Sequence, residues 1–229
     1  MKSVLRMCAC AILASAPWLD GADISGRVRV TKSLTKKKIT VSQVYERAAA
    51  MPAPPANAAD FLREEIGRVV IYLEGNLPAP QPVTARIDQL QRRFEPDVVA
   101  IPVGSSVSFT NSDPIFHNVF SLSKWKSFDL GNYPKGQSRT VTFQESGVVQ
   151  VYCHLHPNMS AAIVVTPTGR SARPDADGNY FLKDVPPGNY QLVAWHKSAG
   201  FFRRQIELKR GGSIQMDWDI PLRESLAAR

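Results

Sequence analysis

Three residues that bind soft metals recur at intervals of three along the chain, Cys153, His156 and Met159. This spacing allows one tight loop to turn a thiolate, an imidazole and a thioether toward a single point. Two histidines and a cysteine in a plane, with a weak axial methionine, form the copper sites that transfer electrons. A second histidine, His117, follows a predicted strand and turn. The sequence therefore predicts one copper ion held by His117, Cys153, His156 and Met159.

Other chemistries fit these residues less well. Covalent haem attachment requires Cys-x-x-Cys-His, and position 150 is Gln150. A cysteine nucleophile requires a histidine base and no methionine in its loop, and zinc gains nothing from the thioether. A binuclear copper centre would need a second cysteine beside Cys153, and multicopper enzymes need more histidines than His154 and His196 supply. We therefore expect a protein that is not an enzyme.

The remaining two histidines are not expected to bind the copper ion. His154 is adjacent to Cys153 on an alternating strand, so its side chain is predicted to point the other way. His196 follows Trp195 in a distant predicted strand, where a structural or exposed role is expected.

Period-two alternation of β-branched and aromatic residues predicts the elements that position this loop. It occurs around Val107 and Phe109, around Val141 and Phe143, and over residues 214–220. Apolar strands are also predicted on both sides of the ligand loop, and Gly- and Pro-rich turns separate the segments. The pattern favours an all-β protein. The exception is residues 40–67, which are rich in Ala and Pro, where Asn57 is predicted to cap a short helix that ends at Ile66.

From about Val83 to Thr166 the chain resembles the cupredoxins, the small blue copper proteins such as plastocyanin and amicyanin. The resemblance rests on Phe94-Glu95-Pro96, on His117-Asn118-Val119 and on the Cys-x-x-His-x-x-Met loop. It implies a Greek-key β-sandwich, copper as the cofactor, the same four ligands and a redox protein as the partner. It also implies that Asn118 fastens the two ligand loops to each other by hydrogen bonds.

A second resemblance covers residues 170–222, which contain an Asp-Gly strand start and a Val-Pro-Pro-Gly-x-Tyr turn. This segment is similar to the small transthyretin-like or carboxypeptidase-regulatory-like β-sandwich, and residues 24–28 and 69–73 would supply its opening strands. The whole chain resembles bacterial proteins of the methylamine-utilisation type. The expected division is a signal peptide at 1–22, the first strands of the regulatory-like sandwich with a basic, Ala/Pro-rich insertion at 23–80, the cupredoxin domain at 81–166, and the rest of the regulatory-like sandwich at 167–222.

Composition places limits on the partners and the compartment. The chain has 229 residues and a net charge of +8, with 44% hydrophobic and 21% charged residues, which is typical of a globular protein. The basic clusters lie near no nucleic-acid-binding motif, so no nucleic-acid partner is expected. No apolar stretch reaches the roughly 20 residues of a transmembrane helix. Lys2 and Arg6 followed by a short apolar run to Leu19 predict a signal peptide and a periplasmic or otherwise exported protein.

The expected function is electron transfer, in which the copper ion cycles between Cu(II) and Cu(I). The alternative is a copper carrier or a structural copper-binding module of a cell-envelope assembly, without redox turnover. The sequence names neither the redox partner nor the oligomeric state.

Overall fold

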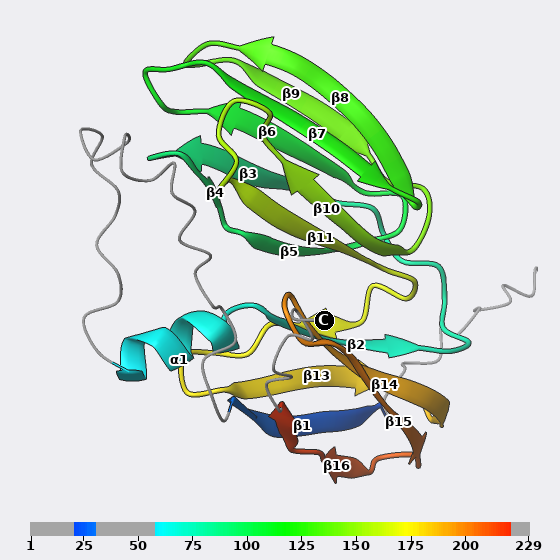
Figure 1. Cartoon of the computed structure of the whole chain (residues 1–229). Helices are drawn as coiled ribbons and strands as arrows, with labels where there is room; N and C mark the ends of the chain where they lie inside the picture. The colour runs from blue at the N-terminus through cyan, green and yellow to red at the C-terminus, as the bar shows by residue number, and fades with distance from the viewer. Residues whose placement is uncertain (1–20, 31–57, 221–229) are drawn as a thin grey trace, which may run out of the picture.

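The structure is a computed structural model that describes residues 21–30 and 58–220 (Figure 1). Within these residues the chain is β-structure apart from one short helix, α1 (Ala58–Ile66), so the predicted all-β class is confirmed. The helix ends at the predicted residue, Ile66. Residues 1–20 of the predicted signal peptide lie outside the described residues, as do the basic segment before residue 58 and the predicted cap Asn57.

Two of the four sheets in the described part of the chain are built from strands at its two ends. In one sheet β13, β1 and β16 are neighbours and β17 also pairs with β1, and in the other the order is β12-β2-β14-β15. These strands are β1 (Ala22–Val30), β2 (Val69–Glu74), β12 (Ser171–Ala172), β13 (Asn179–Val185), β14 (Gly188–His196), β15 (Gly200–Leu208), β16 (Ser213–Gln215) and β17 (Trp218–Ile220). We call this pair of sheets the outer sandwich.

The other two sheets contain only strands from the segment between β2 and β12. Their orders are β5-β11-β10-β7-β8 and β4-β3-β6-β9. These strands are β3 (Thr84–Leu90), β4 (Arg93–Glu95), β5 (Val98–Pro102), β6 (Ser106–Asn111), β7 (His117–Ser123), β8 (Lys126–Tyr133), β9 (Ser138–Thr142), β10 (Gly147–Tyr152) and β11 (Ser160–Thr166). We call this pair the ligand sandwich. Among the described residues no strand pairs across the two sandwiches, which supports the proposal that residues 81–166 are inserted between the second and third strands of the outer sandwich.

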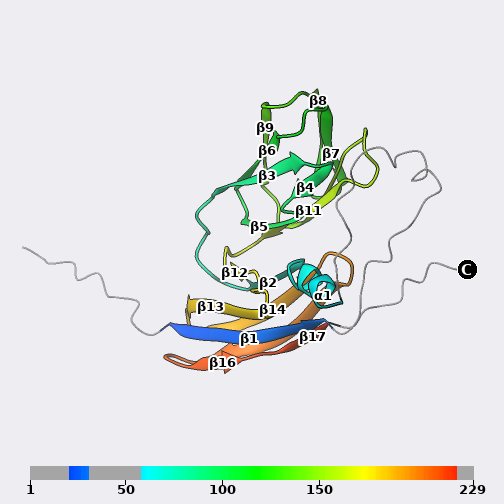
Figure 2. The same cartoon turned by 90° about the vertical axis from the view of Figure 1, so that its left-hand side faces the viewer.

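The four sheets lie in layers, and a separate apolar core fills each space between them (Figures 1 and 2). The middle core joins the two sandwiches, since Val70, Tyr72 and Trp195 of β2 and β14 pack with Ala162 and Val164 of β11. Strands β2, β11 and β14 are therefore buried on both faces. Their nearly continuous apolar sequences follow from this, because a strand covered on both sides has no polar face to alternate with.

Candidate metal centre

Two strand ends bring the predicted ligands together at one end of the ligand sandwich. His117 is the first residue of β7, and Cys153 directly follows β10. Tyr152, the last residue of β10, pairs with Phe120 of β7 on one side and with Ser160 of β11 on the other. The second pairing closes residues 153–159 into a short loop, in which the Met159 amide donates to the His156 carbonyl at 2.9 Å.

Three of the four predicted ligands present their donor atoms to one point. The Cys153 Sγ atom lies 3.9 Å from Nδ1 of His117 and 3.7 Å from Nδ1 of His156. All three donor atoms lie within 4.8 Å of one another. His117 is fully buried, Cys153 is 4% exposed and His156 is half-buried. The site is therefore enclosed, with its access to solvent at His156.

The spacing of the donor atoms would suit a small metal ion held by Cys153 and the two histidines. Ligand bonds of about 2.0–2.3 Å to nitrogen and sulfur would separate neighbouring donors by roughly 3.7 Å. The observed sulfur–nitrogen distances of 3.7 and 3.9 Å are close to this separation. A thiolate with two imidazoles and a thioether is a donor set that favours copper. The residues present therefore fit copper, the cofactor that the sequence predicts.

Met159 directly precedes β11 and is 1% exposed. It belongs to the same apolar core as Cys153, between the two sheets of the ligand sandwich. A thioether buried in the same core as Cys153 is a candidate for the weak fourth ligand, and its apolar surroundings exclude water from the sulfur. Its assignment as the axial ligand remains a proposal.

Asn118 makes three hydrogen bonds, two of which connect the two ligand segments. Its amide N–H donates to the Cys153 sulfur at 3.4 Å, and its side-chain oxygen accepts the His154 amide at 3.3 Å. Its side-chain nitrogen donates to Asp129 at 2.7 Å. Asn118 is 1% exposed, so water does not compete for these bonds. Such contacts around a metal site fix the orientation of the ligands and tune the metal.

Asp113 also belongs to the site, although no role for it was predicted from the sequence. Its Oδ2 atom lies 2.8 Å from Nε2 of His117, the ring nitrogen that faces away from Cys153. The carboxylate also accepts the amides of Gln91 and Arg92 at 2.6 and 2.8 Å. With Nδ1 directed at the metal position, Nε2 keeps its proton and donates it to Asp113. A carboxylate in this position fixes the tautomer of the ring and raises its basicity as a ligand.

The charges around Cys153 favour the form of its side chain that binds metals. Burial raises the pKa of the Cys153 thiol, but the neighbouring ring of His117 and the amides of Asn118, Leu155 and His156 outweigh burial and hold the pKa below its usual value. The thiolate is both the nucleophilic and the metal-binding form of cysteine. The Cys153 thiol therefore loses its proton more readily than an ordinary cysteine.

The hydrogen bonds of Asp113 and His117 shift the pKa values of both side chains. Burial raises the pKa of the Asp113 carboxyl, but the Arg92 amide, the His117 ring and the Gln91 amide outweigh burial, and the net shift is downward. Burial lowers the pKa of His117, whereas Cys153 and Asp113 at its two nitrogens raise the pKa above its usual value. Asp113 therefore remains a carboxylate and accepts a hydrogen bond from Nε2–H of His117.

The other two histidines lie outside the ligand set. His154 is on the outer face of the sheet with its side chain 56% exposed, and its ring stacks on Phe120 with centroids 3.7 Å apart. His196 is the last residue of β14 in the outer sandwich and is fully buried beside Glu65. Both positions agree with the expectation that neither residue is a ligand.

Comparisons with solved structures find partial similarity to copper proteins. A copper-containing nitrite reductase from Thermus scotoductus SA-01 shares 28% identity and a TM-score of 0.34, over 38% of this chain and 22% of its own length. A purple cupredoxin from Nitrosopumilus maritimus shares 28% identity and a TM-score of 0.32, over 35% of this chain and 98% of its own. A reduced amicyanin mutant shares 25% identity and a TM-score of 0.34, over 36% of this chain and 81% of its own.

No family model and no curated protein matches the chain. The three likenesses each cover less than two fifths of this chain. Within the described residues, the segment predicted to resemble a cupredoxin forms the two sheets of the ligand sandwich.

Proposed function

We propose that this protein transfers electrons through one copper ion bound by His117, Cys153, His156 and Met159. The observation that supports this most directly is the enclosed convergence of the Cys153 sulfur with Nδ1 of both histidines. When bound, copper supplies a one-electron couple between Cu(II) and Cu(I). The chain's own residues supply a rigid set of donors that suits both oxidation states.

Rigidity of the ligands is what electron transfer requires of the protein. Asn118 fixes the position of the Cys153 sulfur, and Asp113 fixes the ring of His117 from its other side. Because these supporting contacts are buried, the ligands have little freedom to move when the charge at the centre changes. A site that changes shape little between oxidation states exchanges electrons with a small reorganisation cost. A carrier that releases copper would instead benefit from mobile or exposed ligands.

The half-buried ligand His156 is the proposed point at which electrons enter and leave. The residue before each histidine ligand is an exposed apolar side chain, Phe116 at 56% and Leu155 at 46% exposure. An apolar surface of this kind is suited to brief docking of another protein. We therefore propose a redox protein as the partner, with His156 between the copper ion and the docked surface. The protein would act as an electron carrier and not as an enzyme.

Export is part of the proposal. It is supported by the basic start and short apolar run of residues 1–19. Among the described residues, no helix has the length and apolar content required to cross a bilayer.

Replacement of the axial candidate separates electron transfer from copper carriage. Met159→Gln offers a harder oxygen donor, so it should retain one copper ion while lowering the reduction potential, by 59 mV for each tenfold loss of Cu(I) preference. Redox titration and copper competition would be measured on the same two proteins. Met216→Gln, a half-buried methionine of the outer sandwich, is the matched control and should leave both quantities unchanged. Loss of copper from Met159→Gln, with an unchanged potential in the fraction that stays loaded, would favour the carrier.

A further inference from the structure

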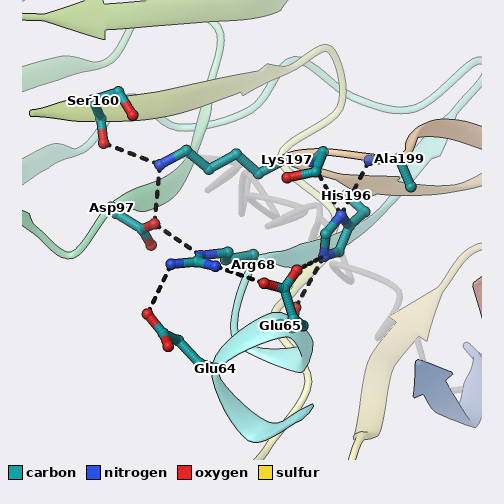
Figure 3. A network of polar contacts seen from close by, with 9 residues as sticks. Glu64, Glu65, Arg68, Asp97, Ser160, His196, Lys197 and Ala199 are labelled. Atoms are coloured by element: carbon teal, nitrogen blue, oxygen red, sulfur yellow. Dashed lines mark hydrogen bonds and ion pairs between the residues drawn. The ribbon is translucent and has the colours of Figure 1, made fainter. Parts of the chain in front are cut away.

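A lysine from the outer sandwich contacts the backbone at the end of the copper-ligand loop (Figure 3). Lys197 lies in the turn between β14 and β15. Its Nζ atom donates to the carbonyl oxygen of Ser160 at 3.0 Å and to Oδ2 of Asp97 at 2.9 Å. Ser160 is the first residue of β11 and directly follows Met159. The contact therefore connects the outer sandwich to the residue beside the proposed axial ligand.

Lys197 is held in place by a polar network between the sandwiches (Figure 3). Arg68 donates from Nε to the same Asp97 oxygen at 3.0 Å, and its carbonyl accepts the Lys197 amide at 3.3 Å. Arg68 also donates at 2.7 Å to Glu65, whose side chain is fully buried. The side chains of Lys197 and Arg68 are only 15% and 16% exposed. Charge-assisted hydrogen bonds are strongest where water is excluded in this way.

The base from which Lys197 extends is itself fixed to the ligand sandwich. The middle core packs Tyr72 and Trp195 with Val164 of β11, so the two sandwiches bury apolar surface against each other. Asp97, the acceptor of the Lys197 ammonium, is in turn fixed within the ligand sandwich, because its carbonyl accepts the Ala162 amide at 2.9 Å. The end of β14 therefore has a defined position relative to the start of β11.

The start of β11 needs support from outside its own sheet. Ser160 and Tyr152 form the last pair of the β10–β11 ladder, and the ligand loop begins immediately beyond that pair. The other end of the loop is fastened at Cys153 by Asn118. At Ser160 the corresponding bond comes from Lys197.

We propose that Lys197 is a positioning residue of the copper site, which holds the C-terminal end of the ligand loop and with it Met159. The outer sandwich is then a structural part of the metal centre, and its docking to the ligand sandwich sets how firmly the loop is closed. This inference rests on the proposed copper site, but the loop anchor itself can be tested in the protein without metal.

The test compares Lys197→Met with Lys209→Met in the full chain. Methionine keeps the length of the side chain and removes its donors, and Asp97 keeps its bonds to Arg68, so the variant is expected to fold. Lys209 is exposed, so its variant is the matched control. Hydrogen exchange would be measured without metal across the loop and across β6 and β9. In Lys197→Met the amides of His156 and of residues 158–160 should exchange about tenfold faster, the size expected for one lost charge-assisted bond, with β6 and β9 unchanged.

The copper-loaded proteins provide the second readout. Lys197→Met should release copper to a chelator faster than wild type and shift the thiolate-to-copper absorption band, whereas Lys209→Met should do neither. Loop exchange within twofold of wild type would overturn the proposal. An equal acceleration across the whole chain would also overturn it, since Lys197 would then stabilise only the fold. A wild-type protein with no such copper band would refute the proposed function, while the exchange comparison would still decide on the anchor.

Discussion

Neutralising Asp113 should raise the reduction potential of the copper site. The Asp113 carboxylate lies 2.8 Å from Nε2 of His117, so a metal on the far ring nitrogen would be about 7 Å from the negative charge, given metal–nitrogen bonds near 2 Å. A negative charge at that distance stabilises Cu(II) more than Cu(I). With an effective dielectric constant of about 20, loss of the charge removes about 2.4 kcal/mol of this preference. For a one-electron couple this corresponds to a rise of about 100 mV in Asp113→Asn.

The measurement is a spectroelectrochemical titration of wild type, Asp113→Asn and a control carboxylate variant. Glu145 is exposed in the turn before β10, and the length of that strand places it about 20 Å from the ligand loop. That separation exceeds the Debye length of about 8 Å at physiological salt, so Glu145→Gln should leave the potential unchanged. An Asp113→Asn protein that keeps its copper and shows an unchanged or lower potential would refute the assigned role of Asp113.

Two further predictions concern residues near the site and between the sandwiches. His154→Ala should leave the thiolate-to-copper absorption nearly intact, because His154 points to solvent and stacks on Phe120; bleaching in this variant would show that the ligand assignment is wrong. For Asp97, burial raises its pKa but Lys197 and Arg68 outweigh burial, and the pKa is lowered. Its carboxylate therefore stabilises the fold above the unfolded-state pKa of about 3.9, and this contribution is lost as pH falls through the folded-state pKa. Asp97→Asn should flatten the acid side of the stability curve in denaturant titrations between about pH 2 and 6, and an unchanged acid side would contradict the charge pairing.

The convergence of Cys153 and His156 could be predicted because the two residues are close in sequence. The short loop limits how far apart Cys153, His156 and Met159 can lie. A cysteine, a histidine and a methionine at this spacing have few explanations other than metal binding. His117 required long-range pairing between β7 and β10, but the chain contains only four histidines. His154 was expected to point away from Cys153 by strand alternation, but it lies beyond β10 in the ligand loop, so its exposed side chain follows from the loop conformation and its stacking on Phe120.

Asp113 was missed because its role depends on tertiary structure. In the sequence it precedes Pro114, which is typical of a turn, and a carboxylate accepting two backbone amides is common in turns. Only the folded chain shows that the same carboxylate accepts a bond from His117. The available signal was an acidic residue four positions before a predicted ligand, since metal-binding histidines regularly donate their second nitrogen to a carboxylate.

The layered arrangement was only partly predictable. Alternation predicted the strands around Val107 and Val141, and both are present as β6 and β9. The continuous apolar sequences of β2 and β11 also indicate burial on both faces, but they do not identify what covers the second face. Here each covers the other, in the middle core.

The polar network between the sandwiches carries no sequence signal. Asp97 and Lys197 are 100 residues apart, and each has the appearance of an ordinary surface charge. Their pairing depends on how two separate sandwiches pack, which local patterns do not encode. His196 was expected to be structural or exposed, and its complete burial beside Glu65 follows from the same packing.

The central claim is most directly tested by adding Cu(II) to the purified protein and recording its absorption spectrum beside that of Cys153→Ser. The Cys153 thiolate is the ligand that would give the site its colour, and its sulfur already lies within 4 Å of both histidine nitrogens. One equivalent of Cu(II) should therefore produce an intense thiolate-to-copper absorption band, and a blue colour, in the wild-type protein and neither in Cys153→Ser. A colourless wild-type protein, or a variant that keeps the band, would contradict the proposed copper site.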